Sequence, residues 1–218
     1  MERDEMNRML AWLDLRSDVV FNKIPADRYR YYLESALAAG EHEAIPLLGQ
    51  NIRQLCNDNQ IEICLEQGDG LFFSVQFRAK FEYSQKKSIR RVTLYEPSLK
   101  SLQISCARAG LDFSLNKIID IHLAHEFFHF LEYSRQQPVG SQLEKICNFS
   151  LGPIRSYSTV SATSEIAAHR FCQLLNDLEH YPTYYDFLWL EHSGKHTKPQ
   201  NDRLFAESLQ ALRKIHQT

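Results

Sequence analysis

The sequence predicts an α+β fold, in which a small antiparallel or mixed sheet packs on helices. Three observations support this prediction. Apolar residues recur at helical spacing before residue 57, short runs of β-branched and aromatic residues follow between 61 and 95, and helical spacing returns after about Lys100. An order of helices, then strands, then helices is typical of α+β domains and not of folds in which strands and helices alternate.

The length of the chain limits the number of domains. A chain of 218 residues suits one domain with helical extensions, and its apolar fraction of 44% is enough for an ordinary buried core. We expect a central domain over residues 25–180. A helical extension would precede it at 1–24, and another would follow it at 181–218.

The first part of the chain has the pattern of three helices. Two of them cover 4–20 and 25–39, and Pro25 sits in the first turn of the second, where proline is tolerated. Pro46 begins the third helix, which ends at the turn-forming residues 57–59. We therefore expect the chain to be helical up to the first strand.

The middle of the chain has the pattern of strands. Turn signals such as Gly68-Asp69-Gly70 divide short runs that are rich in β-branched and aromatic residues. The segment Glu96-Pro97-Ser98 stops the last run, because proline cannot continue a paired strand. The expected strands are 61–66, 71–77, 80–84 and 89–95.

The last part of the chain returns to helices. Either Asp112 or Ser114 can cap a long helix that ends before Pro138. Another helix begins near Thr163, and two more are expected at about 183–192 and 202–216.

Composition excludes several classes of protein. The 25 basic and 27 acidic residues give a net charge of −2, which disfavours a nucleic-acid-binding protein, because such proteins need a strongly basic face. The five cysteines are scattered and form no Cys-x-x-Cys pair, so we expect reduced thiols and no disulfide framework. The charged N-terminus lacks the apolar core of a signal peptide, and no apolar run is long enough to span a membrane. We expect a cytoplasmic protein.

The segment HEFFH at 125–129 predicts a metal site. On a helix, His125 and His129 lie on one face about one turn apart and can reach the same ion. Glu126 lies about 100° around the helix, where it can act as a base towards a water that Zn²⁺ activates. The composition gives only roughly 0.03 expected chance matches to this pattern.

The flanks of this segment favour a real site and leave the third ligand open. Apolar residues on both sides indicate a buried helix, in which polar side chains need partners. A catalytic zinc commonly has three protein ligands. Glu165 is the candidate that we favour, although an acidic residue there can also simply stabilise the start of a helix. The other candidates are Glu144, His169, Asp177, Glu179 and His180.

The region resembles the ImmA/IrrE-type metallopeptidases, a gluzincin-like family with HExxH on one helix and a glutamate ligand on the next. The family's second helix tends to contain E-x-x-A-x-x-F before a leucine pair, which Glu165, Ala168 and Phe171 match. The resemblance covers roughly residues 30–178. It implies a zincin-like minimal metallopeptidase fold with Glu165 as the third zinc ligand. The strand at 89–95, the last before the HEFFH helix, is either a core strand or an edge strand that pairs with an extended substrate, and the resemblance favours the second interpretation. In this family the substrate is often a repressor or another regulatory protein.

Three further residues are candidates for supporting roles. His169, one turn after Glu165, is an alternative ligand, a residue that orients Glu165, or a plain surface histidine. His122 either supports the ligands or is a core histidine with an internal partner, and we favour the second interpretation. Tyr157 lies on the connection between the two helices, where it is a candidate oxyanion donor or a tyrosine that only packs its ring.

The sequence thus leads to two hypotheses of function. The first is a zinc-dependent metallopeptidase that cleaves a peptide bond in a selected protein substrate, with Glu126 as the base. The second is a regulatory or sensory module that contains the metal and binds a partner protein with little or no proteolysis. Glu126 favours the first hypothesis, because a purely structural zinc site does not need it. Both hypotheses imply a protein or peptide partner, and neither involves a membrane or nucleic acid.

Overall fold

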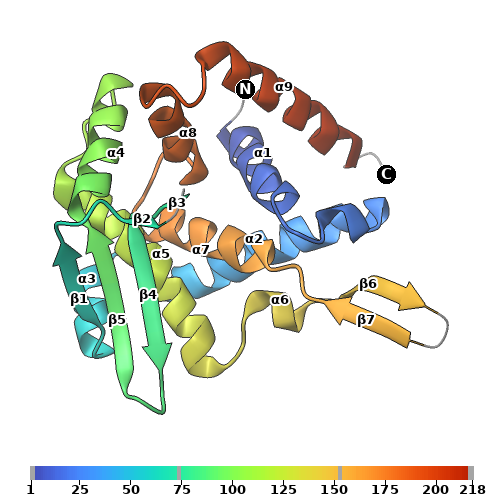
Figure 1. The fold of residues 1–218 in the computed structure, drawn as a ribbon, viewed down its shortest axis with the longest axis horizontal. Coiled ribbons are helices and arrows are strands. Elements are labelled where there is room, and N and C mark those ends of the chain that lie inside the picture. Colours follow the sequence, from blue (N-terminus) through green and yellow to red (C-terminus); the bar gives the residue numbers. More distant parts are fainter. Residues whose placement is uncertain (1–2, 73–74, 152–153, 216–218) are drawn as a thin grey trace.

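A computed structural model describes residues 3–72, 75–151 and 154–215, and it has the predicted α+β architecture (Figure 1). A small mixed sheet packs on helices, as expected. Within these ranges, no helix is both long enough and apolar enough to cross a membrane.

The helices and strands follow the predicted order with a few changes. The α-helices are α1 (Arg3–Arg16), α2 (Tyr29–Ala44), α3 (Ile52–Asp58), α4 (Glu96–Arg108), α5 (Leu115–Arg135), α6 (Val139–Gln142), α7 (Ala162–Leu175), α8 (Thr183–His192) and α9 (Lys198–Ile215). The strands are β1 (Glu62–Glu66), β2 (Leu71–Phe72), β3 (Val75–Gln76), β4 (Ala79–Ser84), β5 (Ile89–Tyr95), β6 (Ile146–Leu151) and β7 (Ile154–Ser158).

The three-stranded sheet has the order β1-β5-β4. β1 pairs with β5 in parallel, and β4 pairs with β5 in antiparallel orientation. The expectation that the strand at 89–95 pairs with a substrate is therefore wrong, because β5 is the central strand and has neighbours on both sides. Its last four residues are buried, as expected of a central strand. The two edge strands in this order are β1 and β4.

Several local predictions also differ from the structure. The helix expected to begin at Pro46 begins at Ile52 as α3, and Pro46 lies in a separate 3-10 turn (Ile45–Leu47). The run 71–77 is not one strand but includes two short ones, β2 and β3, that pair with each other; residues 73–74 lie outside the described ranges. Helix α4 begins at Glu96, because Pro97 suits a first helical turn as well as it stops a strand. The β6–β7 hairpin, in the connection between α5 and α7, was not predicted.

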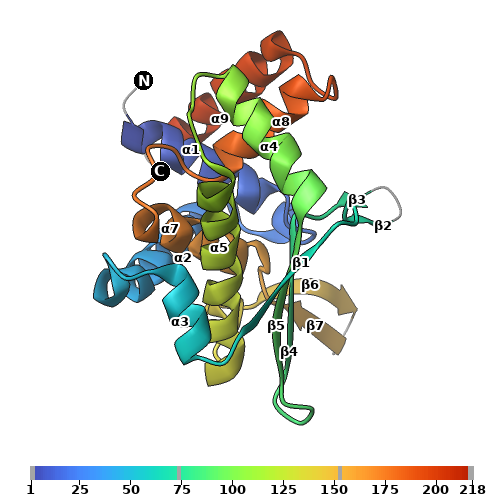
Figure 2. The same cartoon turned by 90° about the vertical axis from the view of Figure 1, so that its left-hand side faces the viewer.

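Helix α5 packs against one face of the three-stranded sheet (Figure 2). The rings of Phe81 and Tyr83 on β4 lie 6.4 Å and 6.1 Å from the ring of Phe130 on α5. Helix α7 packs against α5 on its side away from the sheet, and α2 packs against α7. Gly40 permits this last approach, because a Cβ there would lie 2.2 Å from the carbonyl oxygen of Ala167.

Helix α7 contributes to two hydrophobic cores formed by the described residues. One core contains Phe171 of α7 together with residues of α3, α4, α5 and β5. The other contains Ile166 of α7 together with residues of α1, α2 and α9. Because α7 is packed from both sides, the residues on its exposed turns have well-defined positions.

Candidate metal centre

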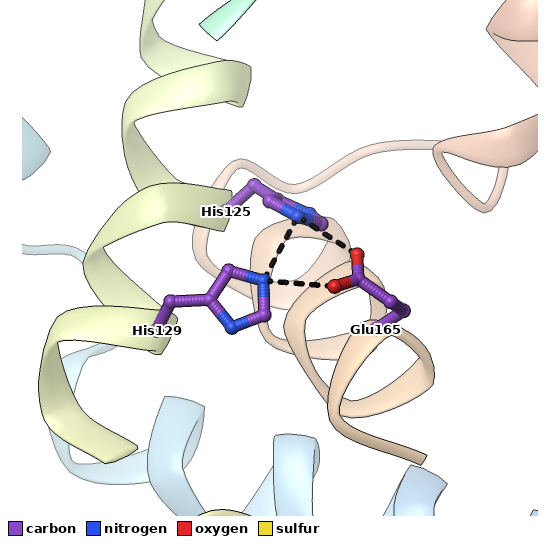
Figure 3. A group of neighbouring side chains, drawn as sticks. All are labelled: His125, His129 and Glu165. Carbon is purple, nitrogen blue, oxygen red and sulfur yellow. Dashed lines mark hydrogen bonds and ion pairs between the residues drawn. The ribbon is translucent and has the colours of Figure 1, made fainter. Parts of the chain in front are cut away.

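Helix α5 brings the two histidines of the motif together. Ser114 is the residue that caps it, because the Ser114 hydroxyl accepts a hydrogen bond from the backbone N–H of Lys117 at 3.1 Å. The helix ends where Gln136 takes a left-handed conformation with φ 55°. His125 and His129 lie within this uninterrupted helix, on one face (Figure 3).

The side chains of His125, His129 and Glu165 point toward one another (Figure 3). The two Nε2 atoms are 3.2 Å apart. The carboxylate of Glu165, on α7, lies 3.3 Å from Nε2 of His125 and 3.4 Å from Nε2 of His129. Two imidazole nitrogens and a carboxylate thus converge on one point, and this is the group that can hold a metal ion in the described part of the chain.

The spacing of these atoms agrees with tetrahedral metal coordination. Zinc binds histidine nitrogen and carboxylate oxygen at about 2.0–2.2 Å, and neighbouring ligand atoms of a tetrahedron are separated by about 1.63 bond lengths, or roughly 3.3–3.6 Å. The observed separations of 3.2, 3.3 and 3.4 Å lie at or close to this range. The donor set therefore suits a zinc ion without rearrangement.

Glu126 lines a cavity of about 320 Å³ together with His125 and Glu165. Burial raises the pKa of the Glu126 carboxyl, while the nearby histidines oppose this shift. Glu126 thus faces the same space as His125 and Glu165 without belonging to the ligand group. This is the position that a base needs relative to a water between these residues.

Glu132, which the sequence analysis did not single out, holds His129 in place. Its Oε2 lies 3.0 Å from Nδ1 of His129. Its Oε1 accepts hydrogen bonds from the backbone N–H of Val139 at 2.7 Å and from the hydroxyl of Ser164 at 2.8 Å. A carboxylate on the far nitrogen of a ligand histidine fixes the ring and makes it a stronger ligand. The signal in the sequence is an acidic residue three positions after His129, within the apolar run that follows the motif.

Carboxylates on both sides of His129 determine its protonation. Burial lowers the pKa of His129, but its hydrogen bonds with Glu132 and Glu165 outweigh burial and raise the pKa to about 10. Burial opposes ionisation of the Glu165 carboxyl, yet its contacts with His125 and His129 hold its pKa far below the usual range. A metal ion that bound here would have to displace any proton on Nε2 of His129.

His169 lies beside the ligand group but does not belong to it. Its ring centroid is 4.8 Å from that of His125, and the residue lines the same cavity. Its Nδ1 lies 2.9 Å from Oδ2 of Asp14, on α1. Burial lowers the pKa of His169, but the Asp14 carboxylate outweighs burial and the pKa is raised.

His122 has an internal partner. Its Nδ1–H donates to the carbonyl of Ile118, one turn earlier, at 2.8 Å. Burial and the charge of Arg78 lower its pKa to about 4, so the ring stays neutral. His122 also lines the cavity. Its hydrogen bond has the form expected of a core histidine.

The structure does not bring Tyr157 to the candidate ligands. Tyr157 is on β7, its side chain is 52% exposed, and it does not line the cavity that contains His125 and Glu126, so far as the described residues define that cavity. Its role as an oxyanion donor stays a prediction.

Compared with protein-family models, with curated proteins and with solved structures, the chain has no significant match.

Proposed function

We propose that the protein is a zinc-dependent metallopeptidase of zincin-like, ImmA/IrrE type. His125, His129 and Glu165 would hold the zinc, and Glu126 would act as the base. The observation that carries this proposal is the group of three ligand atoms 3.2–3.4 Å apart, with Glu126 on the wall of the same cavity. A structural zinc site usually has four protein ligands and does not need a neighbouring acidic residue, so three ligands beside Glu126 favour a catalytic site.

The chemistry follows from what each residue can do. A zinc ion supplies a Lewis acid that makes water a nucleophile near neutral pH and polarises a carbonyl. Glu126 takes a proton from the attacking water and can pass it to the nitrogen of the leaving amine. Glu132 keeps the ring of His129 aligned, and Ser164 ties Glu132 to the start of α7, the helix that carries Glu165.

The free edge of β4 supports a peptide as the substrate. β4 pairs with β5 on one side and with no other strand in the described parts of the sheet. Ala79, its first residue, lines the cavity that contains His125 and Glu126. An extended peptide that adds to this edge through backbone hydrogen bonds would pass next to the candidate metal ligands.

Selectivity for one protein substrate belongs to the same proposal. The cavity is small, so it admits only a short part of a substrate, and the rest must be recognised along β4. We propose a repressor-type regulator in the cytoplasm as the substrate, on the basis of the family resemblance.

The β4 edge also keeps the second hypothesis open. An edge strand can dock an extended segment of a partner without any cleavage. A regulatory module of this kind would bind zinc and the partner, and Glu126 would have no effect on the fate of the partner.

Glu126→Gln separates the two functions. Wild type and variant are loaded with zinc and incubated with a random peptide library, and new peptide termini are identified by mass spectrometry. We expect wild type to cleave a subset of the peptides and Glu126→Gln to cleave them at least about 100-fold more slowly, because the base is lost while the ligands remain.

Asp120→Asn is the matched control. Asp120 lies on the same helix but is paired with Arg53 at 2.7 Å, outside the cavity. The Asp120→Asn variant should cleave peptides at the wild-type rate. Equal cleavage by Glu126→Gln would refute the role of the base, and a wild type that binds zinc and peptides but cuts none would favour the regulatory module.

A further inference from the structure

Asp14, on the first helix of the chain, is the centre of a hydrogen-bond network beside the candidate metal centre. Its side chain is only 15% exposed. Besides His169, its carboxylate accepts hydrogen bonds from the hydroxyl of Tyr181 at 3.1 Å and from that of Thr183 at 3.0 Å. These three partners come from α7, from the following loop and from α8, so α1 joins all of them at one point.

The network leaves one nitrogen of His169 for the cavity. A carboxylate only accepts hydrogen bonds, so the Nδ1 of His169 carries the hydrogen that Asp14 receives. Nε2 lies on the other side of the ring. His169 lines the cavity together with Glu126, whereas Asp14 does not. Because Nδ1 is bonded to Asp14, a molecule in the cavity would have to contact this ring through Nε2.

A second carboxylate of the same segment holds the start of α7. Asp18 is 8% exposed. Its Oδ2 accepts hydrogen bonds from the backbone N–H of Ala162 at 2.7 Å and from the hydroxyl of Ser161 at 3.0 Å. Glu165 lies in the first turn of this helix. The segment that ends α1 thus positions both Glu165, through the helix start, and His169, through its ring.

We propose that His169 is a further catalytic residue, whose Nε2 makes a hydrogen bond with the scissile peptide group, and that Asp14 is the positioning residue that holds its ring. The proposal rests on the proposed peptidase function. It makes the N-terminal helix a part of the active site, although that helix lies more than 100 residues before the motif. A fixed hydrogen-bonding group aimed at the reacting bond lowers the barrier without reorganisation.

The test is a double-mutant cycle with zinc-loaded proteins and a library peptide that wild type cleaves. The variants are Asp14→Asn, His169→Gln and the double substitution. We expect kcat/KM to fall about 10-fold in Asp14→Asn and about 100-fold in His169→Gln, mainly through kcat. The double variant should be no slower than His169→Gln, because Asp14 acts through the ring.

Two measurements separate this role from a structural one. Zinc content, and the visible spectrum of the Co²⁺-substituted protein, should equal those of wild type in each variant, because neither residue is a ligand. Asp4→Asn is the matched control on α1, because Asp4 is 75% exposed and pairs with Arg8. This variant should have the same kcat/KM as wild type. His169→Gln leaves the bonds of Asp14 to Tyr181 and Thr183 intact, so it tests the proposal even if Asp14→Asn is unstable.

Each other outcome is decisive. Cleavage that is lost in Glu126→Gln but retained in His169→Gln would refute this inference and leave the proposed function standing. Losses that multiply in the double variant would show that Asp14 does not act through the ring of His169. A Co²⁺ spectrum that changes in His169→Gln would show that this residue acts on the metal site and not on the substrate. No cleavage by wild type would remove the proposed function, and this inference with it.

Discussion

The molecule holds two histidines through carboxylates, and it builds the two pairs differently. On α5, Glu132 bonds to His129 from three residues away along the same helix. On α7, His169 is bonded by Asp14, which lies 155 residues earlier in the chain. The first pair depends on a single helix, whereas the second depends on the packing of α1 against α7.

This difference separates two tasks. Glu132 supports a ring whose other nitrogen faces Glu165, so it acts on the candidate metal ligands. Asp14 supports a ring outside the ligand group, so it acts on the wall of the cavity. A change on α5 should therefore alter metal binding, and a change on α1 should alter what happens to a bound substrate.

His129→Ala should have the largest effect on metal binding. It removes one of three ligand atoms and leaves the buried Glu132 without its histidine partner. We expect zinc affinity to fall by more than about 100-fold. This loss is larger than the usual loss when a residue that only hydrogen-bonds to a metal ligand is replaced. Competition with a chromophoric chelator measures it. His42→Ala, at an 86% exposed position, is the control. Equal affinities would exclude the site.

Glu132→Gln should reduce zinc affinity by about 10–100-fold, because the ring of His129 loses its charged partner. The glutamine oxygen can still accept from the backbone N–H of Val139, so the fold should persist. Asp14→Asn, measured by the same chelator competition, should stay within about 2-fold of wild type. If both variants lost affinity equally, the separation of the two pairs would fail.

Asp18→Asn should lower the free energy of unfolding by about 1 kcal/mol, because the start of α7 loses a charged acceptor while the amide oxygen keeps one bond. Urea denaturation of the metal-free protein measures this loss. Asp4→Asn, on the exposed side of α1, should change it by no more than about 0.5 kcal/mol. Equal stability of the two variants would contradict the role of Asp18 at α7.

Tyr157→Phe should have the smallest effect. Because Tyr157 is half exposed and does not line the cavity in the described structure, we expect the rate of peptide cleavage to stay within about 2-fold of wild type. A loss as large as that in His169→Gln would instead make Tyr157 the oxyanion donor that its place in the sequence suggests.

Local patterns predicted the parts of the fold that depend on neighbouring residues. The apolar spacing around 115–135 predicted α5, and Ser114, one of two candidates, caps it. The β6–β7 hairpin was missed although Gly152-Pro153 is a turn signal in the sequence, because the runs of six and five residues beside it are too short for their periodicity to be distinctive. The central position of β5 was missed because strand order depends on which strands meet in space.

The sequence by itself determined that His125 and His129 share one face of a helix, because helical periodicity is a local property of the backbone. It also indicated Glu165, through its place in the next helix. Only the tertiary structure decided that Glu165 meets the two histidines at ligand distances, that the edge strand β4 begins at the cavity, and that Asp14 holds His169. These contacts join distant parts of the chain, and they form only when the two hydrophobic cores pack against α7.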